Sequence, residues 1–119
     1  MYGGDILIIS TRVKKGILIV KMTGELDHHT AGPIRDSVDK IIMKGCVNHI
    51  LFDLSSLSMM DSSGIGMIIG RYKIVSSDGG KVSIFAKSKN ILKLIKMSGI
   101  EKITPVYEEI EKAEDYLNA

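Results

Sequence analysis

Asp61-Ser62-Ser63-Gly64-Ile65-Gly66 lies where an apolar run ends and a helical pattern begins. Before it, residues 49–54 read as a short, largely buried strand. After it, apolar residues recur at helical spacing; they are Ile65, Ile68, Ile69, Tyr72 and Val75. A helix start leaves backbone N–H groups unpaired, and Asp and Ser side chains accept hydrogen bonds from such groups. The sequence therefore predicts a strand, a loop and a helix start that meet at Ser62.

The N-terminal half predicts a hairpin followed by a helix. Residues 5–12 and 16–23 are rich in β-branched side chains and are separated by the turn signal Lys14-Lys15-Gly16. Beyond Asp27 the pattern changes to helical period, with Pro33 suited to a first turn and Gly45 to the stop. The apolar face of this helix carries Ile34, Val38, Ile41 and Ile42.

The C-terminal half continues the alternation of helices and strands. The helix after the serines, about residues 63–76, is followed by a strand at 81–86. Ser88 is a good N-cap for a short helix that Gly99 closes, and a short strand is expected at 103–106. Apolar residues at helical spacing then predict a terminal helix; they are Val106, Ile110, Ala113 and Leu117. The fold class is therefore α/β, with a mixed sheet of four to five strands flanked by about four helices.

Composition limits the class of protein. A chain of 119 residues with 45% hydrophobic content suits one domain. A net charge of +2, with both signs mixed, gives no field that would bind nucleic acid or an anionic membrane. No apolar segment approaches the ~20 residues that span a bilayer. Residues 1–5 lack the layout of a signal peptide, and the lone Cys46 excludes an internal disulfide, so we expect a cytoplasmic protein.

Motifs for catalysis and metal binding are missing. The serines lack the Gly-x-Ser-x-Gly elbow of hydrolases, and the segment lacks the spacing of a nucleotide-binding loop. His28 and His29 are adjacent, so their side chains are expected to diverge. Cys46 and His49 match no metal spacing, and a buried thiol is expected at Cys46. We assign no enzymatic activity, no metal and no cofactor. The basic stripe of the short helix reads as a solvated face; it is formed by Lys89, Lys93 and Lys96.

Three glycines in the helix after Ser62 need an explanation, because each interior glycine costs roughly 0.8–1 kcal/mol relative to alanine. We expect Gly66 and Gly70 to pack closely against the sheet, and Gly64 to leave backbone open to a partner. For Ser62 two interpretations remain open. It is either an ordinary helix cap or an exposed switch.

Four segments together resemble the sporulation anti-sigma F factor antagonists, which are STAS domains. They are Gly24-Glu25-Leu26-Asp27-His28-His29-Thr30, Met60-Asp61-Ser62-Ser63-Gly64-Ile65-Gly66, Gly70-Arg71-Tyr72-Lys73 and Met97-Ser98-Gly99-Ile100. The resemblance covers nearly the whole chain, and the first two segments together are fairly specific. The sequence departs from the family pattern at Gly32-Pro33 and in a short N-terminal extension.

The resemblance implies one STAS domain over residues 1–119 and a binding function. Members of the family bind an anti-sigma factor that is also a serine kinase, and this binding frees sporulation sigma factor F. The resemblance places the phosphorylated serine at Ser62, with Ser63 as its unmodified neighbour, and gives Ser58 no role. A serine phosphatase is expected to remove the phosphate. The loop at Asp27 is carried over as a partner-contact candidate, beside Asp61 and Gly64.

A physical mechanism accompanies this expectation. A phosphoserine adds about −1.5 to −2 charges, and we expect the N–H groups of Ser63, Gly64 and Ile65 to receive its oxygens, so that the domain survives while the complex breaks. Two alternatives stay open. One is a STAS regulator of another pathway, such as general stress, and the other is a small serine-dependent or nucleotide-binding enzyme that uses Ser62, Asp61 and a histidine.

Overall fold

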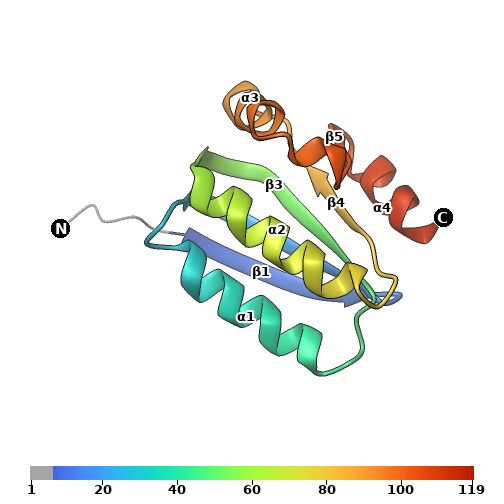
Figure 1. Cartoon of the computed structure of the whole chain (residues 1–119). Helices are drawn as coiled ribbons and strands as arrows, with labels where there is room; N and C mark the ends of the chain where they lie inside the picture. The colour runs from blue at the N-terminus through green and yellow to red at the C-terminus, as the bar shows by residue number, and fades with distance from the viewer. Residues whose placement is uncertain (1–6) are drawn as a thin grey trace.

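The computed structural model describes residues 7–119. Its strands are β1 (Leu7–Lys14), β2 (Ile17–Leu26), β3 (His49–Met60), β4 (Val82–Phe85) and β5 (Val106–Tyr107). Its helices are α1 (Ala31–Met43), α2 (Ser62–Ser76), α3 (Lys89–Ser98) and α4 (Ile110–Asn118), with a short 3-10 turn at Ile100–Lys102. The five strands form one mixed sheet, which confirms the predicted fold class (Figure 1).

The predicted N-terminal hairpin is confirmed. β1 runs antiparallel to β2, and the two strands are joined at Lys15 and Gly16. Both turn residues have positive φ, 52° and 77°, which is the backbone of a tight two-residue hairpin turn and favours glycine at the second position. Residues 5 and 6 of the predicted first strand lie outside the described residues.

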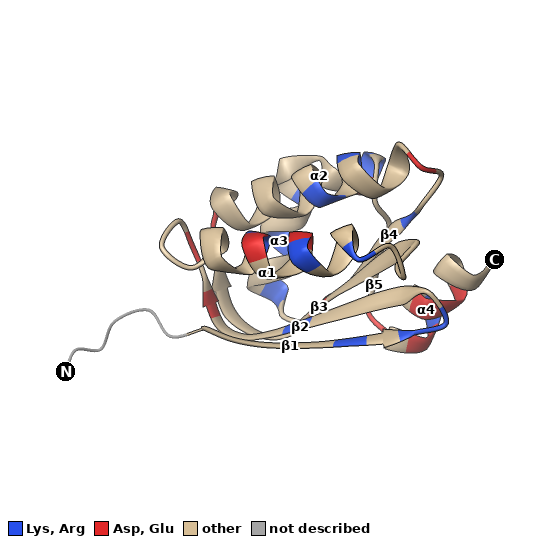
Figure 2. Cartoon of the chain, turned by 90° about the horizontal axis from the view of Figure 1, so that it is seen from below, with Lys and Arg blue, Asp and Glu red and all other residues tan. Residues whose placement is uncertain are grey.

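The order of the strands explains where the helices lie. The strands are arranged β1-β2-β3-β4-β5, and β2, β3, β4 and β5 run parallel to one another. Because parallel crossovers are right-handed, a sheet that grows in one direction places α1, α2 and α3 on the same face. α4 packs on the opposite face (Figure 2), over a smaller core made of Ile17, Ile19, Leu51, Phe85, Ala113 and Leu117.

The carboxyl ends of β2 and β3 bring two loops together. Leu26 pairs with Met60 in the sheet, and the N–H of Asp61 donates to the carbonyl of Leu26 at 3.1 Å. The loop that begins at Asp27 and the start of α2 therefore lie at the same edge. In open α/β sheets this edge is the usual place for a binding site.

Strands β3 and β5 differ from the prediction in their bounds. β3 does not end at residue 54 but continues to Met60, because Leu57 and Met60 still face the core between the polar serines. The last strand is not 103–106 but Val106–Tyr107. Val106 pairs with Ile84, so it belongs to the sheet and not to the apolar face of the terminal helix, which begins at Ile110.

The predicted helix signals of the C-terminal half are confirmed. The hydroxyl of Ser88 accepts from the N–H of Ile91 at 3.4 Å, and Gly99 ends α3 with a φ of 77°. The lysines of the predicted basic stripe are exposed. Among residues 7–119, no helix combines the length and the hydropathy needed to cross a membrane.

Candidate functional site

Asp61 caps helix α2. Its carboxylate accepts from the N–H of Ser63 at 2.8 Å, and its backbone carbonyl accepts from the N–H groups of Gly64 at 3.0 Å and Ile65 at 3.4 Å. Ser62 is the first residue of the helix and is exposed. Of the two interpretations that the sequence left open, capping by Ser62 is wrong, because Asp61 fills that position.

The same contacts show that the expected binding site for a phosphate on Ser62 is wrong. The N–H groups of Ser63, Gly64 and Ile65 were expected to receive the oxygens of a phosphorylated Ser62. All three already donate to Asp61, two of them to its carbonyl and one to its side chain. A phosphate at Ser62 would therefore lie beside a capping carboxylate and not in an open cradle of amides.

The three serines near the loop differ in their surroundings. Ser62 is exposed, whereas Ser63 is half-buried and lines a groove between α1 and α2. Ser58 lies within β3, and its hydroxyl donates to the carbonyl of Gly24 at 3.0 Å. Ser58 is exposed like Ser62, but its hydroxyl is held by this hydrogen bond to the backbone.

Asp27 organises the neighbouring loop. It is only 6% exposed, and its Oδ1 accepts from the N–H groups of His29 at 2.8 Å and Thr30 at 3.1 Å. Its own N–H donates to the hydroxyl of Thr30 at 2.9 Å. The exposed side chains of this loop are those of His28 and His29. The adjacency of these two histidines in the sequence does not indicate that both side chains lie on the loop surface.

The histidine pair also corrects an expectation. The rings of His28 and His29 do not diverge, because the turn after Asp27 brings their centroids to 3.9 Å. Ligand atoms of Asp27, His28 and His29 lie within 4.8 Å of one another, so these residues form a group that could hold a metal ion. Cys46 lies apart in the loop after α1 and is exposed, not buried as expected.

His49, the first residue of β3, takes part in a hydrogen bond. Its Nδ1 accepts from the N–H of Lys81 at 3.0 Å, which ties the start of β3 to the segment before β4. Burial lowers the pKa of His49, and the positive charge of Lys81 lowers that pKa further. This histidine therefore acts as a neutral hydrogen-bond acceptor in the folded protein.

A groove of about 400 Å³ runs between α1 and α2 and reaches both loops. Its lining residues are His28, Ala31, Gly32, Arg35, Ser63, Gly66, Met67, Gly70 and Arg71. Arg71 is buried, and its Nε lies 2.8 Å from Oδ1 of Asp39 on α1. This ion pair joins the two helices at the far end of the groove from His28 and Ser63.

The glycines of α2 have the reverse of their expected roles. Gly64 is buried, and a Cβ there would lie 2.6 Å from Cγ of Met60. At Gly66 and Gly70 an added Cβ would meet no atom within 4 Å. The reason is helical phase. Each residue turns an α-helix by about 100°, so when Gly64 faces the sheet, Gly66 faces away from it.

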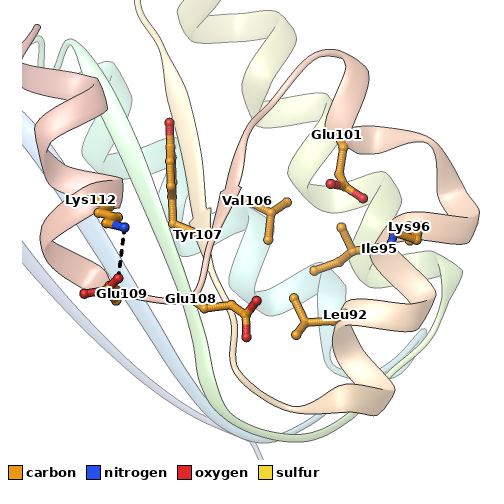
Figure 3. A pocket seen from close by; sticks show the side chains of 9 residues that line it. All are labelled: Leu92, Ile95, Lys96, Glu101, Val106, Tyr107, Glu108, Glu109 and Lys112. Atoms are coloured by element: carbon orange, nitrogen blue, oxygen red, sulfur yellow. Dashed lines mark ion pairs between the residues drawn. The ribbon is translucent and has the colours of Figure 1, made fainter.

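A second hollow of about 440 Å³ lies between α3, β5 and α4. Figure 3 shows Leu92, Ile95 and Val106 converging on it, with Glu101 and Glu108 at its margin. Its lining contains no serine, histidine or cysteine. The modifiable serines and the histidine pair therefore belong to the α1–α2 side of the molecule.

Comparison with known proteins identifies the family that has this fold. The STAS domain family matches residues 9–113. The chain belongs to the STAS domain family.

Two of the relatives that the chain matches are named anti-sigma F factor antagonists. The one from Paenibacillus polymyxa is 42% identical over 94 residues, which are 79% of this chain and 80% of the relative. The one from Lysinibacillus sphaericus is 33% identical over 88 residues, 74% of this chain and 75% of the relative. The anti-sigma-B factor antagonist of Bacillus subtilis (strain 168) is 27% identical over 92 residues, 77% of this chain and 83% of the relative.

Solved structures agree with this membership. The anti-sigma factor antagonist SpoIIAA in its unphosphorylated form has a TM-score of 0.74 at 25% identity, covering 94% of this chain and 99% of the other. The Bacillus cell fate determinant SpoIIAA in the phosphorylated form has a TM-score of 0.71 at 27% identity, covering 92% and 99%. The relatives and the unphosphorylated SpoIIAA named here are thus antagonists of anti-sigma factors.

Proposed function

We propose that this STAS protein is a switchable antagonist of an anti-sigma factor. In its unphosphorylated form it binds an anti-sigma factor that is also a serine kinase and releases sporulation sigma factor F. Phosphorylation of Ser62 ends this binding, and a serine phosphatase restores it. The observation that carries the proposal is the exposed Ser62 at the first position of α2, beside the capping Asp61. The names of the relatives at 42% and 33% identity support the choice of sigma factor.

The proposed contact surface is formed by the two neighbouring loops. It contains Asp27, Asp61, Ser62, Ser63 and Gly64. Within it, Asp27 acts by holding its loop, since its carboxylate accepts hydrogen bonds from two backbone N–H groups of that loop. Gly64 acts by letting α2 begin close to Met60. We propose that the domain extends over residues 1–119, acts in the cytoplasm without binding nucleic acid directly, and has no catalytic role.

Electrostatics explain the release. A phosphate at Ser62 brings about −1.5 to −2 charges next to the carboxylate of Asp61. The amides at the helix start already donate to Asp61, so they do not neutralise the added charge. The phosphate therefore faces the partner, where desolvation and repulsion weaken the complex. A hundredfold loss of affinity needs only about 2.7 kcal/mol.

Phosphorylation tests the proposal directly. The purified chain is incubated with the anti-sigma F kinase and Mg-ATP, and peptide mass spectrometry locates the phosphate. We expect phosphate on Ser62, none in Ser62→Ala, and normal labelling in the matched control Ser58→Ala. Ser62→Ala should bind the kinase as tightly as the wild type, whereas Ser62→Asp should fold normally and bind more weakly. Phosphate on Ser63 in the wild type would contradict the proposal.

A second candidate function shares the switch but changes the partner. The anti-sigma-B factor antagonist of Bacillus subtilis matches the chain at 27% identity, so an antagonist in a general stress pathway is the alternative. Purified kinases of the two types distinguish them. Binding and phosphorylation by an anti-sigma-B kinase, with neither from the anti-sigma F kinase, would select the stress pathway.

A further inference from the structure

Gly66 and Gly70 lack a structural reason within the fold. A glycine inside a helix is less stable than alanine, and packing compensates for this at Gly64 but not at the other two positions. Both lie one turn apart on the side of α2 that lines the α1–α2 groove. The absence of side chains there leaves the backbone of α2 open to close approach by another molecule.

The groove is also basic. Its lining includes Arg35, Arg71 and His28 and no Asp or Glu, and the carboxylate of Asp39 reaches Arg71 from outside the lining. Arg35 pairs with the adjacent Asp36 at 3.3 Å, but both side chains are more than half exposed, so this contact is weak. The side chain of Arg35 is therefore available to a ligand in the groove.

Arg71 adds buried donors. It is 8% exposed, and one of its five N–H donors is satisfied by the carbonyl of Met67, at 3.2 Å from Nη1. Its Nε contacts Asp39 at 2.8 Å as an ion pair but without the geometry of a hydrogen bond, and within residues 7–119 this buried nitrogen has no hydrogen-bond partner. A buried guanidinium with unused donors beside an open backbone suits a carboxylate.

We propose that the α1–α2 groove receives an acidic segment of the partner protein. The backbone of this segment lies against Gly66 and Gly70, and its carboxylates pair with Arg35 and Arg71. The inference rests on the proposed function, since it gives the anti-sigma factor a second point of contact beside the serine loop. It also extends the switch. Ser63 lines the groove, so a phosphate on the adjacent Ser62 places negative charge at its entrance and repels the acidic segment.

The first experiment examines the groove without the partner. A poly-glutamate peptide is titrated into the ¹⁵N-labelled chain, and backbone amide shifts are followed by NMR. We expect saturable shifts of the Gly66 and Gly70 amides. The affinity for the peptide that these shifts report should fall at least tenfold in Arg35→Gln and should decrease with added salt. The matched control Lys73→Ala, an exposed cation of α2 outside the groove, should behave as the wild type. The proposal would be overturned if the peptide caused no shifts at these glycines. The same holds if a separate titration with ATP shifted them and the peptide did not.

The second experiment uses the anti-sigma F kinase. Gly66→Ala should raise the midpoint of thermal unfolding, because alanine favours the helix, and yet lower the affinity for the kinase at least tenfold. A gain in stability with unchanged affinity would overturn the proposal. If the wild-type chain binds the peptide in its groove but not the kinase, the proposed function is wrong and the acidic-segment site stands.

Discussion

A methyl group at Gly64 would lie 2.6 Å from Cγ of Met60 and 2.9 Å from Cδ2 of Leu26. Both neighbours are buried, so either these side chains or the start of α2 would have to shift. We expect Gly64→Ala to lower the free energy of unfolding by about 1–3 kcal/mol, the usual cost of overpacking. Urea denaturation measures this. Gly66→Ala is the matched control and should change stability in the opposite direction; a stabilised Gly64→Ala would contradict the packing role.

At the scale of single residues, the sequence identified the right segment but not the orientation of its side chains. Asp61 and Ser62 are both common at helix starts, and only the position of the first helical turn decides which one caps. The expected directions of Gly64, Gly66 and Gly70 were wrong for a related reason. Apolar residues surround α2 on most sides, including Ile65, Met67, Ile68 and Ile69, so the pattern does not indicate which side meets the sheet.

At the scale of elements, the C-terminal end of α4 is bound by Lys81, the residue just before β4. Nζ of Lys81 donates to the carbonyls of Tyr116 at 3.2 Å and Ala119 at 2.9 Å, and it lies 5.2 Å from the centre of the Tyr116 ring. Cations at a helix C-terminus stabilise its unpaired carbonyls by about 0.3–1 kcal/mol. Lys81 therefore fastens the last turn of α4 to the sheet.

We predict that Lys81→Met loosens α4 and leaves the rest of the domain intact. Amide hydrogen exchange in α4 should accelerate about two- to fivefold, as expected for a loss of up to 1 kcal/mol. Exchange in α1 and α2 should not change. Lys112→Met, which removes an exposed lysine of α4 itself, is the control and should have a smaller effect. Uniform acceleration across all helices would show that Lys81 acts on the whole fold.

The elements whose bounds were predicted correctly contain local sequence patterns that mark their ends, whereas β5 contains none. Ser88 and Gly99 bound α3 by capping chemistry that needs no tertiary contact. A strand of two residues is too short to show a period, and Val106 continues the spacing of the terminal helix by coincidence. Its pairing with Ile84 depends on a strand about twenty residues earlier, which local pattern does not contain.

At the scale of the molecule, His49 couples stability to pH. Its pKa is lowered in the folded protein, first by burial and then by the charge of Lys81, so the unfolded chain binds a proton more readily. Stability from this group is present above the ordinary pKa of 6.5 and falls as the pH drops below that value. We expect a lower free energy of unfolding at pH 5.5 than at pH 7.5, measured by urea denaturation.

The variant His49→Asn isolates this contribution. Asn offers an amide oxygen that can accept from the N–H of Lys81, and it does not titrate. The difference in stability between pH 7.5 and pH 5.5 should therefore be smaller in His49→Asn than in the wild type. An identical difference in the two proteins would assign the pH dependence to other groups.

The whole fold was more predictable than its site. Alternation of strands and helices determines the class, and right-handed crossovers then determine which face the helices cover. The α1–α2 groove depends on which side of each helix faces its neighbour. That relation arises from packing between segments some thirty residues apart, and no single segment contains it.

The arrangement of the strands also bears on how the protein is made. The sheet order repeats the chain order from β1 to β5, so each strand meets its neighbour already synthesised as the chain leaves the ribosome. No later strand has to be inserted between two earlier ones. The serine loop, between β3 and α2, emerges before β4, β5 and α4. A nascent chain can therefore extend its sheet strand by strand, and α4 covers the remaining face last.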